Sequence, residues 1–161
     1  MYENYLAENI KFFREKEGVT LAKLSYKSEV TRNILSNIED KRTLDPSMRM
    51  VVAIAKGMKV RVEDLVNKDF RKEGIYYVDN EISNEVEDWM YSKNINAFIQ
   101  SKKLKSADVG RLFNITSSTV GKIRNEKKIS SRVFQIQRIA KAMNVTLDEL
   151  LFENLKFERV D

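Results

Sequence analysis

The side chains most often used in catalysis and metal binding are missing from this sequence. It contains no cysteine and no histidine, so zinc and iron–sulfur sites lose their usual ligands. Nucleophilic centres that pair serine or cysteine with histidine are excluded for the same reason. Catalysis by carboxylates alone remains open, but the acidic residues are scattered among lysines, as on a solvated surface. We therefore expect no enzyme, no metal and no cofactor.

The basic side chains are better candidates for chemistry, namely for binding a polyanion. Residues 1–70 carry 13 basic and 11 acidic side chains, residues 71–90 carry 2 and 6, and residues 91–161 carry 14 and 7. Two basic blocks therefore flank an acidic segment, and the second block is the stronger candidate. The total charge of +5 is modest, and ordinary solvated faces would produce it as readily, so charge alone is weak evidence.

The elements that position these side chains are expected to be helices. Five glycines and one proline in 161 residues are too few for the many tight turns of an all-β fold. No apolar run approaches the length of a membrane span. The first five residues lack the basic and then apolar pattern of a secretory signal, and the absence of cysteine fits a reducing compartment. We predict an all-α protein of the cytoplasm.

An internal repeat divides the chain into two units. Val51–Val60 resembles Ile136–Val145 at a constant offset, which carries Ala55 onto Ala140. The same repeat offset carries Asn9–Ile10 onto Asn94–Ile95. Apolar positions match over most of each unit without a gap, a signature of repeated structural units. Units of this size lie within the range that folds alone.

Each unit is predicted to contain five short helices. In the first unit an apolar stripe marks the first helix, and Gly18 follows its end. Thr20 and Thr31 are suited to cap the next two helices. Asp45–Pro46 is suited to open the fourth, with proline at the first helical position. The second unit repeats the pattern, and its last helix opens with a Thr-x-x-Glu capping box at Thr146.

Residues 104–123 have the spacing of two helices joined by a short turn. Gly110 leaves room where two crossing helices approach each other, and Asn114 tolerates the positive φ that such a turn needs. Three apolar residues anchor the second helix from beneath, namely Ile115, Val120 and Ile123. Its other face is small and polar, which allows a helix to enter a major groove.

With these stretches the sequence resembles the Cro and phage-repressor type of helix-turn-helix domain, also called the xenobiotic-response-element family. The resemblance lies in residues 115–123 and 139–150 of the second unit, and in residues 30–39 and 54–56 of the first. It implies two five-helix lambda-repressor-like DNA-binding domains in tandem. They would cover residues 1–70 and 88–161 and be joined by an acidic linker at 71–87.

The resemblance also implies that the third helix of each unit, at about 31–39 and 116–125, reads DNA. The residues that would face the groove are Thr31, Arg32, Asn33, Ser36 and Asn37 in the first unit, and Thr116, Ser117, Ser118, Gly121 and Lys122 in the second. Arg32, Asn33 and Asn37 are the better base readers, because arginine pairs with guanine and asparagine with adenine. Phosphate contacts are expected from Lys41, Arg42, Ser106, Lys122, Arg124, Lys127 and Lys128.

Some positions depart from the usual pattern of this family. At the start of the second helix, where the family often has a glutamine that grips phosphate, this chain has Leu21 and Ser106. In the first unit Glu29 stands where the turn usually has glycine. Glu39–Asp40 adds acidity beside the expected DNA face.

We predict a sequence-specific regulator of transcription that binds two groove faces of double-stranded DNA and acts as a repressor, associated with the nucleoid through DNA. The alternative is a protein-interaction module, antirepressor-like or antitoxin-like, in which only the second unit contacts DNA. Neither a membrane nor a small-molecule ligand is expected.

Aromatic residues near the linker leave a further partner open. Tyr76, Tyr77, Trp89 and Tyr91 could stack on bases, but packing between units or between chains is the better interpretation. Phe152–Phe157 either closes the second core or pairs with another subunit. A homodimer through these aromatics or through the C-terminal segment is therefore a candidate.

Overall fold

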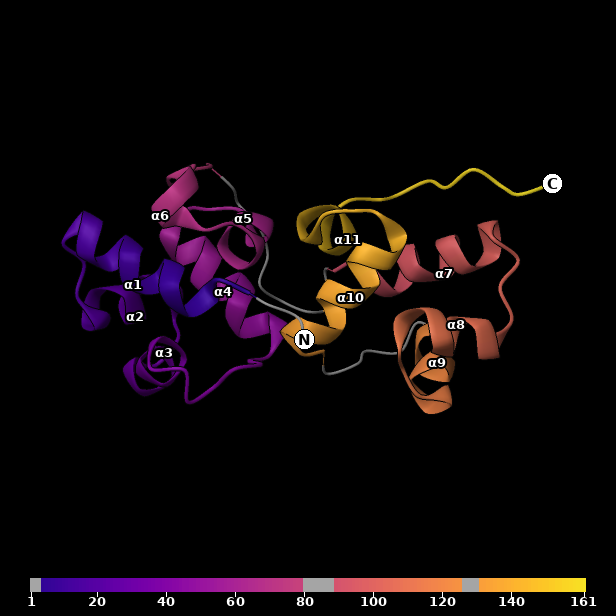
Figure 1. Cartoon of the computed structure of the whole chain (residues 1–161), viewed down its shortest axis with the longest axis horizontal. Coiled ribbons are helices and arrows are strands. Elements are labelled where there is room, and N and C mark those ends of the chain that lie inside the picture. The colour runs from indigo at the N-terminus through magenta and orange to yellow at the C-terminus, as the bar shows by residue number, and fades with distance from the viewer. Residues whose placement is uncertain (1–3, 80–88, 126–130) are drawn as a thin grey trace. The chain divides into compact units, whose positions relative to one another are not determined.

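The structure, a computed structural model, describes residues 4–79, 89–125 and 131–161. The chain divides into two compact units, Met1–Asn84 and Glu85–Asp161 (Figure 1). The first unit contains α1 (Leu6–Glu17), α2 (Leu21–Ser28), α3 (Arg32–Glu39), α4 (Met48–Met58), α5 (Val62–Asn67) and α6 (Phe70–Glu73). The second contains α7 (Tyr91–Ser101), α8 (Ser106–Phe113), α9 (Ser117–Arg124), α10 (Val133–Met143) and α11 (Leu147–Phe152).

The described residues form eleven helices and no strand, so the predicted all-α class is confirmed. Outside the helices they contain one isolated β-bridge, between Val60 and Tyr77. None of these helices combines the length and the apolar character that crossing a bilayer requires.

The helices of the two units follow one another at the repeat offset seen in the sequence. Helices α2, α3, α4 and α5 begin and end at the positions that the offset carries onto the starts and ends of α8, α9, α10 and α11. The first helices, α1 and α7, begin at matching positions, and only their ends differ slightly. The additional helix α6 has no counterpart among the described residues of the second unit.

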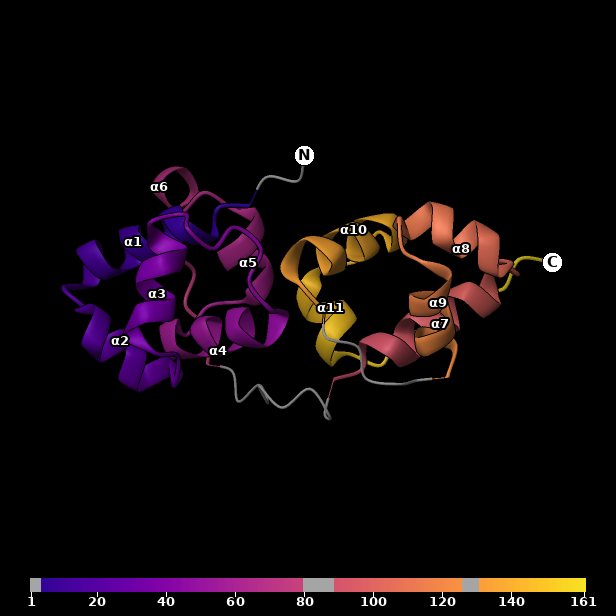
Figure 2. The same cartoon turned by 90° about the horizontal axis from the view of Figure 1, so that it is seen from below.

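Each unit packs its helices in the same way around one apolar core. In the first unit α1 packs against α3 and α5, while α2 packs against α3 and α4. In the second unit α7 packs against α9 and α11, while α8 packs against α9 and α10. Figure 1 shows α3 on the side of its unit opposite to α6, and Figure 2 looks onto that side. The residues predicted to face the core are buried, namely Leu24, Leu35, Ile38, Val109, Val120 and Ile123.

In each unit one buried asparagine on the first helix is hydrogen-bonded to α5 or α11 and to the residues that follow that helix. The Nδ2 of Asn9 donates to the carbonyls of Leu65 at 2.8 Å and Lys68 at 2.6 Å. Its Oδ1 accepts the amide of Phe70 at 3.0 Å. Asn94 makes the same three bonds at 2.8, 2.7 and 3.0 Å, with Leu150, Glu153 and Leu155. Both side chains are almost fully buried, so each amide has its own donors and acceptor satisfied by backbone groups.

Side chains cap the helices largely as the sequence predicts. Thr20 and Thr31 accept hydrogen bonds from the amides of Lys23 and Ile34, and Thr146 forms its capping box with Glu149. The prediction for α4 was wrong, because Ser47 rather than Asp45 is the cap. The hydroxyl of Ser47 accepts the amide of Met50 at 3.4 Å, so the helix starts after Pro46 and not at it.

In each unit a segment near the C-terminal end packs against the first helix. In the first unit the ring of Tyr77 lies 6.4 Å from that of Phe13. The amide of Val78 donates to the carbonyl of Lys59 at 2.7 Å. Burial and a hydrogen bond to Glu17 raise the pKa of Tyr77 to about 12. The described part of the expected linker, up to residue 79, therefore packs on the first unit.

The second unit is closed by its C-terminal segment. The ring of Phe157 lies edge-on to Phe98, with 5.4 Å between the ring centroids, and the amide of Val160 donates to the carbonyl of Ser101 at 3.0 Å. Of the two interpretations of this segment, closing the core is the one observed. Trp89 also packs within this unit, edge-on to Tyr91 and to Phe152 with 6.3 Å between centroids in each case.

The buried asparagine predicts a specific loss of stability. Replacing Asn94 by alanine removes the partner of the buried carbonyl of Leu150 and of two part-buried backbone groups, so we expect the free energy of unfolding of the second unit to fall by about 2–4 kcal/mol. Trp89 is the single tryptophan of the chain and packs in this unit, so its fluorescence in a urea titration measures the loss. The exposed Asn154 provides the control, and Asn154→Ala should change stability by less than about 0.5 kcal/mol. Equal effects of both substitutions would contradict this assignment.

Candidate nucleic-acid interface

The second and third helices of each unit are joined by turns of equal length and conformation. The residue after α2 is Glu29, with φ 58°, and the residue after α8 is Asn114, with φ 52°. Both occupy the left-handed region, as predicted for Asn114. Asparagine adopts this region more readily than glutamate, so the second unit has the more favourable turn. In both units the second residue after this turn residue, Thr31 or Thr116, is the N-cap of the next helix, α3 or α9.

Small residues make room at this corner, but in different ways in the two units. A Cβ atom at Gly110 would lie 3.2 Å from the carbonyl oxygen of Ile115, so this glycine accommodates the turn itself. In the first unit the close approach is between two helices. A Cβ at Gly57 on α4 would lie 2.9 Å from Cα of Ser28, the last residue of α2. This role of Gly57 was not predicted from the sequence.

The residues predicted to read DNA lie on the outer faces of α3 and α9. On α3 itself, Leu35 and Ile38 are buried in the core. Thr31, Arg32 and Asn33 are exposed, and Ser36 and Asn37 are half-buried. On α9 the predicted residues divide in the same way. Thr116, Ser117, Ser118, Lys122 and Arg124 are exposed, and Gly121 is half-buried. Within each unit the structure therefore places the residues predicted to read DNA on one side of the third helix.

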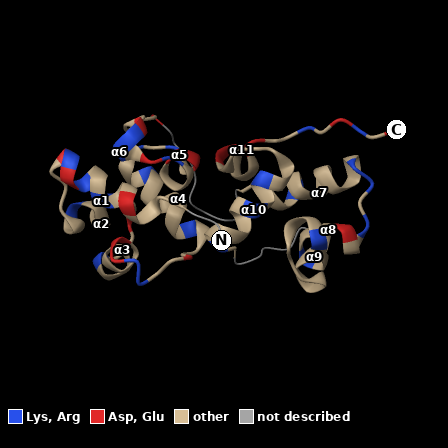
Figure 3. Cartoon of the chain, viewed as in Figure 1, with Lys and Arg blue, Asp and Glu red and all other residues tan. Residues whose placement is uncertain are grey.

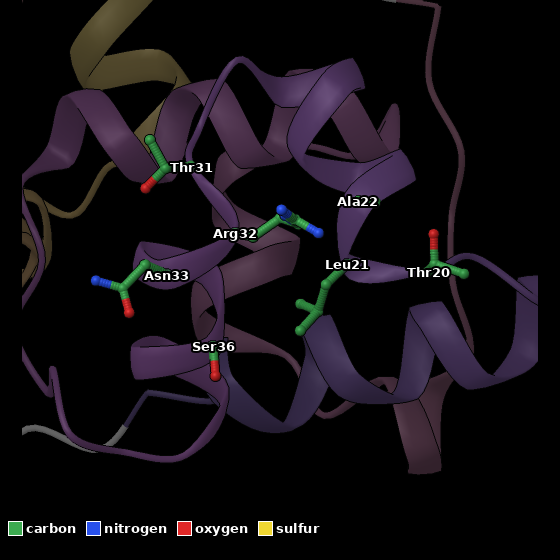
Figure 4. Close-up of a pocket in the computed structure, with 7 residues that line it drawn as sticks. All are labelled: Thr20, Leu21, Ala22, Thr31, Arg32, Asn33 and Ser36. Atoms are coloured by element: carbon green, nitrogen blue, oxygen red, sulfur yellow. The ribbon is translucent and has the colours of Figure 1, made fainter.

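An open hollow of about 770 Å³ lies between the start of α2 and the first turns of α3. It is lined by Thr20, Leu21, Ala22, Thr31, Arg32, Asn33 and Ser36 (Figure 4). In Figure 4 the side chain of Arg32 extends towards the start of α2, whereas that of Asn33 points the other way. Of the residues predicted to read DNA in this unit, all but Asn37 line the hollow. Leu21, at the start of α2, is among the residues that line it.

An ion pair fixes the far end of α3. The guanidinium of Arg14 on α1 donates to both carboxylate oxygens of Glu39, from Nε at 2.5 Å and from Nη2 at 2.8 Å. It also donates from Nη1 to the carbonyl of Val19 at 3.2 Å. The hydrogen bond that Arg14 donates to Glu39 raises the pKa of Arg14 above its ordinary value. The side chain of Glu39 is only 9% exposed, and its charge is compensated by Arg14.

The second unit fixes α9 with different residues in the same places. Residue 99, the counterpart of Arg14, is isoleucine, and residue 124, the counterpart of Glu39, is arginine. Arg124 donates from Nη2 to the carbonyl of Leu104 at 3.1 Å, and Leu104 is the counterpart of Val19. Asn96 on α7 donates to the carbonyl of Ile123 at 2.7 Å and so holds the last turn of α9.

The two cations predicted after α3 are paired with acids of their own unit. Lys41 forms an ion pair with Glu8 on α1, and Arg42 lies 3.2 Å from Asp40. Burial alone would raise the pKa of Glu8, but the hydrogen bond and the charge of Lys41 lower it below its ordinary value. Exposed pairs of this kind contribute little to stability, yet they reduce the net positive charge near α3.

The cations on α9 differ from those after α3 in their surroundings. Lys122 and Arg124 form no ion pair with any acidic side chain in the described part of the unit. Figure 3 shows basic and acidic residues mixed at α3 and along the loop that follows it. The turn between α7 and α8 is instead basic, since Lys102, Lys103 and Lys105 lie in it. Ser106 is exposed as the first residue of α8, and the predicted contacts Lys127 and Lys128 lie outside the described residues.

Residues 94–152 match the family model of the Cro/C1-type HTH DNA-binding domain. The match begins within α7 and extends through α11, so it includes the whole helix-turn-helix of α8 and α9. The second unit is therefore similar to a DNA-binding domain of this type, which supports the resemblance seen in its sequence. No curated protein and no solved structure matches the chain.

The first unit has Arg14 and Glu39 where the second has Ile99 and Arg124, and this difference predicts that a second substitution restores the stability lost by a first. Arg14→Ile leaves the carboxylate of Glu39 buried without its partner, so we expect a loss of roughly 2–4 kcal/mol in the free energy of unfolding. Adding Glu39→Arg recreates the arrangement of the second unit, in which an arginine at the end of the third helix binds the carbonyl of the turn. The double variant should recover most of the loss. Urea denaturation followed by far-ultraviolet circular dichroism measures both, and additive losses would refute the equivalence.

Proposed function

We propose that the protein is a sequence-specific regulator of transcription that binds double-stranded DNA through both units, with α3 and α9 as recognition helices. The observation that carries this proposal is the match of the second unit to the Cro/C1-type domain, together with helices in the first unit that begin and end at the corresponding positions of the repeat. A unit with the same helices, turn and packing presents its third helix in the same manner.

The first unit retains the side chains that base reading requires. Arg32 and Asn33 are exposed in the first turn of α3, and arginine and asparagine form the commonest bidentate contacts to guanine and adenine in the major groove. The acidity that argued against DNA contact is largely compensated, since Glu39 is bound by Arg14 and Asp40 lies beside Arg42.

Two recognition helices on one chain suit one continuous DNA site. In two-fold dimers of helix-turn-helix proteins the half-sites lie one helical turn, about 34 Å, apart. Covalent linkage can take the place of dimerisation, because it raises the effective concentration of the second domain once the first is bound. The outer faces of α3 and α9 differ in sequence, so the site is expected to be asymmetric. Repression would follow from occupying a promoter and excluding the polymerase.

The first unit also supports a second candidate, a protein-interaction role in which only α9 contacts DNA. Glu29 is exposed at the turn, and the charges around α3 are compensated within the unit, which lowers its electrostatic attraction to DNA. A partner of this class would be a protein that binds the outer face of α2 and α3.

Duplex selection tests the DNA-binding proposal and separates the two candidates. We expect the full chain to select, from a random pool, a duplex site that spans two major-groove faces and whose affinity falls steeply with salt. Hydroxyl-radical footprinting of Arg32→Ala/Asn33→Ala should show loss of one half of the protected region. An unchanged footprint would favour the protein-interaction role for the first unit, and binding that is absent or insensitive to salt would reject the DNA-binding function.

A reporter gene tests the sign of regulation. With the selected site placed between promoter elements, expression of the chain should lower reporter output. A site carrying substitutions at the protected bases is the matched control and should leave output unchanged. Increased output from the intact site would show activation and contradict the proposed repression.

A further inference from the structure

The two recognition helices differ in how their charges are compensated. At α3 and in the loop after it, Glu39 is bound by Arg14, Lys41 by Glu8, and Arg42 by Asp40. Arg32 has no acidic partner in the part of the first unit that the structure describes, and it is exposed. Among these described residues, the candidate interface of the first unit therefore offers Arg32 as its uncompensated cation, in the first turn of α3.

The second unit has the opposite distribution. The first turn of α9 carries Ser117 and Ser118 at the positions that Arg32 and Asn33 occupy in α3. The cations of α9 that have no acidic partner among the described residues, Lys122 and Arg124, lie in its last turns. Arg124 donates to a neutral carbonyl, which holds the side chain in place and leaves its charge available to an anion.

These distributions correspond to two different contributions to DNA recognition. Cations that neutralise phosphates release counterions and provide affinity for any sequence, with a strong dependence on salt. Bidentate side chains in the groove distinguish one base pair from another and add little to binding of other sequences. Serine is short and bonds to several bases, so it discriminates weakly.

Resting on the DNA-binding function proposed above, we propose that the two units divide these contributions. The first unit provides sequence discrimination through Arg32 and Asn33, and the second provides affinity for the DNA backbone through Lys122 and Arg124. The DNA partner is a composite site. One half has fixed guanine and adenine positions that α3 reads, and the other half, under α9, tolerates substitution.

The geometry of the first unit supports this assignment of roles. Arg32 and Asn33 are consecutive residues that border the open hollow between α2 and α3. Their side chains extend in opposite directions (Figure 4), as contacts to different base pairs would require. The clamp formed by Arg14 and Glu39 fixes the other end of the helix, as positioned reading residues require.

Four variants of the full chain test the division. Arg32→Ala/Asn33→Ala removes the proposed readers, and Lys122→Gln/Arg124→Gln removes the charge of α9 while glutamine can still donate to the carbonyl of Leu104. Lys72→Ala on α6 is the control for the first unit, because α6 lies on the side of that unit away from α3 (Figure 1). Lys156→Ala in the C-terminal segment serves the second unit.

The measurement is the affinity of each variant for the selected duplex and for a scrambled duplex of equal length, at four salt concentrations. Loss of Arg32 and Asn33 should lower the ratio of the two affinities at least tenfold, since each bidentate contact accounts for roughly 5- to 150-fold of discrimination. Loss of the charges on α9 should lower both affinities by the same factor and reduce the salt exponent by about two. Both controls should leave the ratio and the exponent unchanged.

Two results would overturn the division while the DNA-binding function stands. They are an unchanged ratio after loss of Arg32 and Asn33, and an equal loss of discrimination from both double variants. A wild-type chain that binds neither duplex would instead reject the DNA-binding function and the division with it. Urea denaturation of each variant distinguishes loss of contacts from loss of folding, and rescue of the ratio by Asn33→Gln would further support base reading at residue 33.

Discussion

A single buried amide holds each unit closed. Asn9 and Asn94 bind two carbonyls and one amide each, all contributed by the chain around the end of α5 or α11. Because these backbone groups are buried or part-buried, an apolar residue in place of the amide would leave them without their protein partner. The amide fixes the first helix against the last, and the first helix is in turn the support on which α3 or α9 lies.

The third helix of each unit, α3 or α9, is held at its far end, and the two units achieve this with exchanged residues. The carbonyl of residue 19 or 104 accepts a hydrogen bond from an arginine in both units. In the first unit the arginine belongs to α1, and in the second it belongs to α9 itself. In the first arrangement the arginine is paired with a glutamate on α3, so the two charges cancel at the end of that helix. The second leaves a positive charge at the end of α9. A difference in how a helix is held thus becomes a difference in the charge it presents.

The helices and their caps could be predicted from the sequence because both depend on local spacing. Apolar periodicity, the threonine caps and the constant offset predict most helix starts, and the error at Asp45–Pro46 arose because Ser47, which follows directly, competes for the same cap. The pair Arg14–Glu39 joins residues far apart in the chain and leaves no periodic trace. Its signal was the joint change to Ile99 and Arg124 at the repeat offset. The candidate DNA contacts stay predictions, since their exposure is necessary for binding but is shared by many surface residues.

Joining two unlike units in one chain removes a constraint that symmetry imposes. In a two-fold dimer each copy must provide both base reading and backbone affinity, because the same surface is used twice. When the two domains are covalently linked, one can hold the chain on DNA while the other samples base pairs at a high effective concentration. In such an arrangement α3 and the loop after it would need no free cation beyond Arg32, and pairing of Lys41 with Glu8 would carry no penalty in affinity. The compensated charges around α3 are consistent with a helix freed from holding the backbone, and so with discrimination as its main contribution.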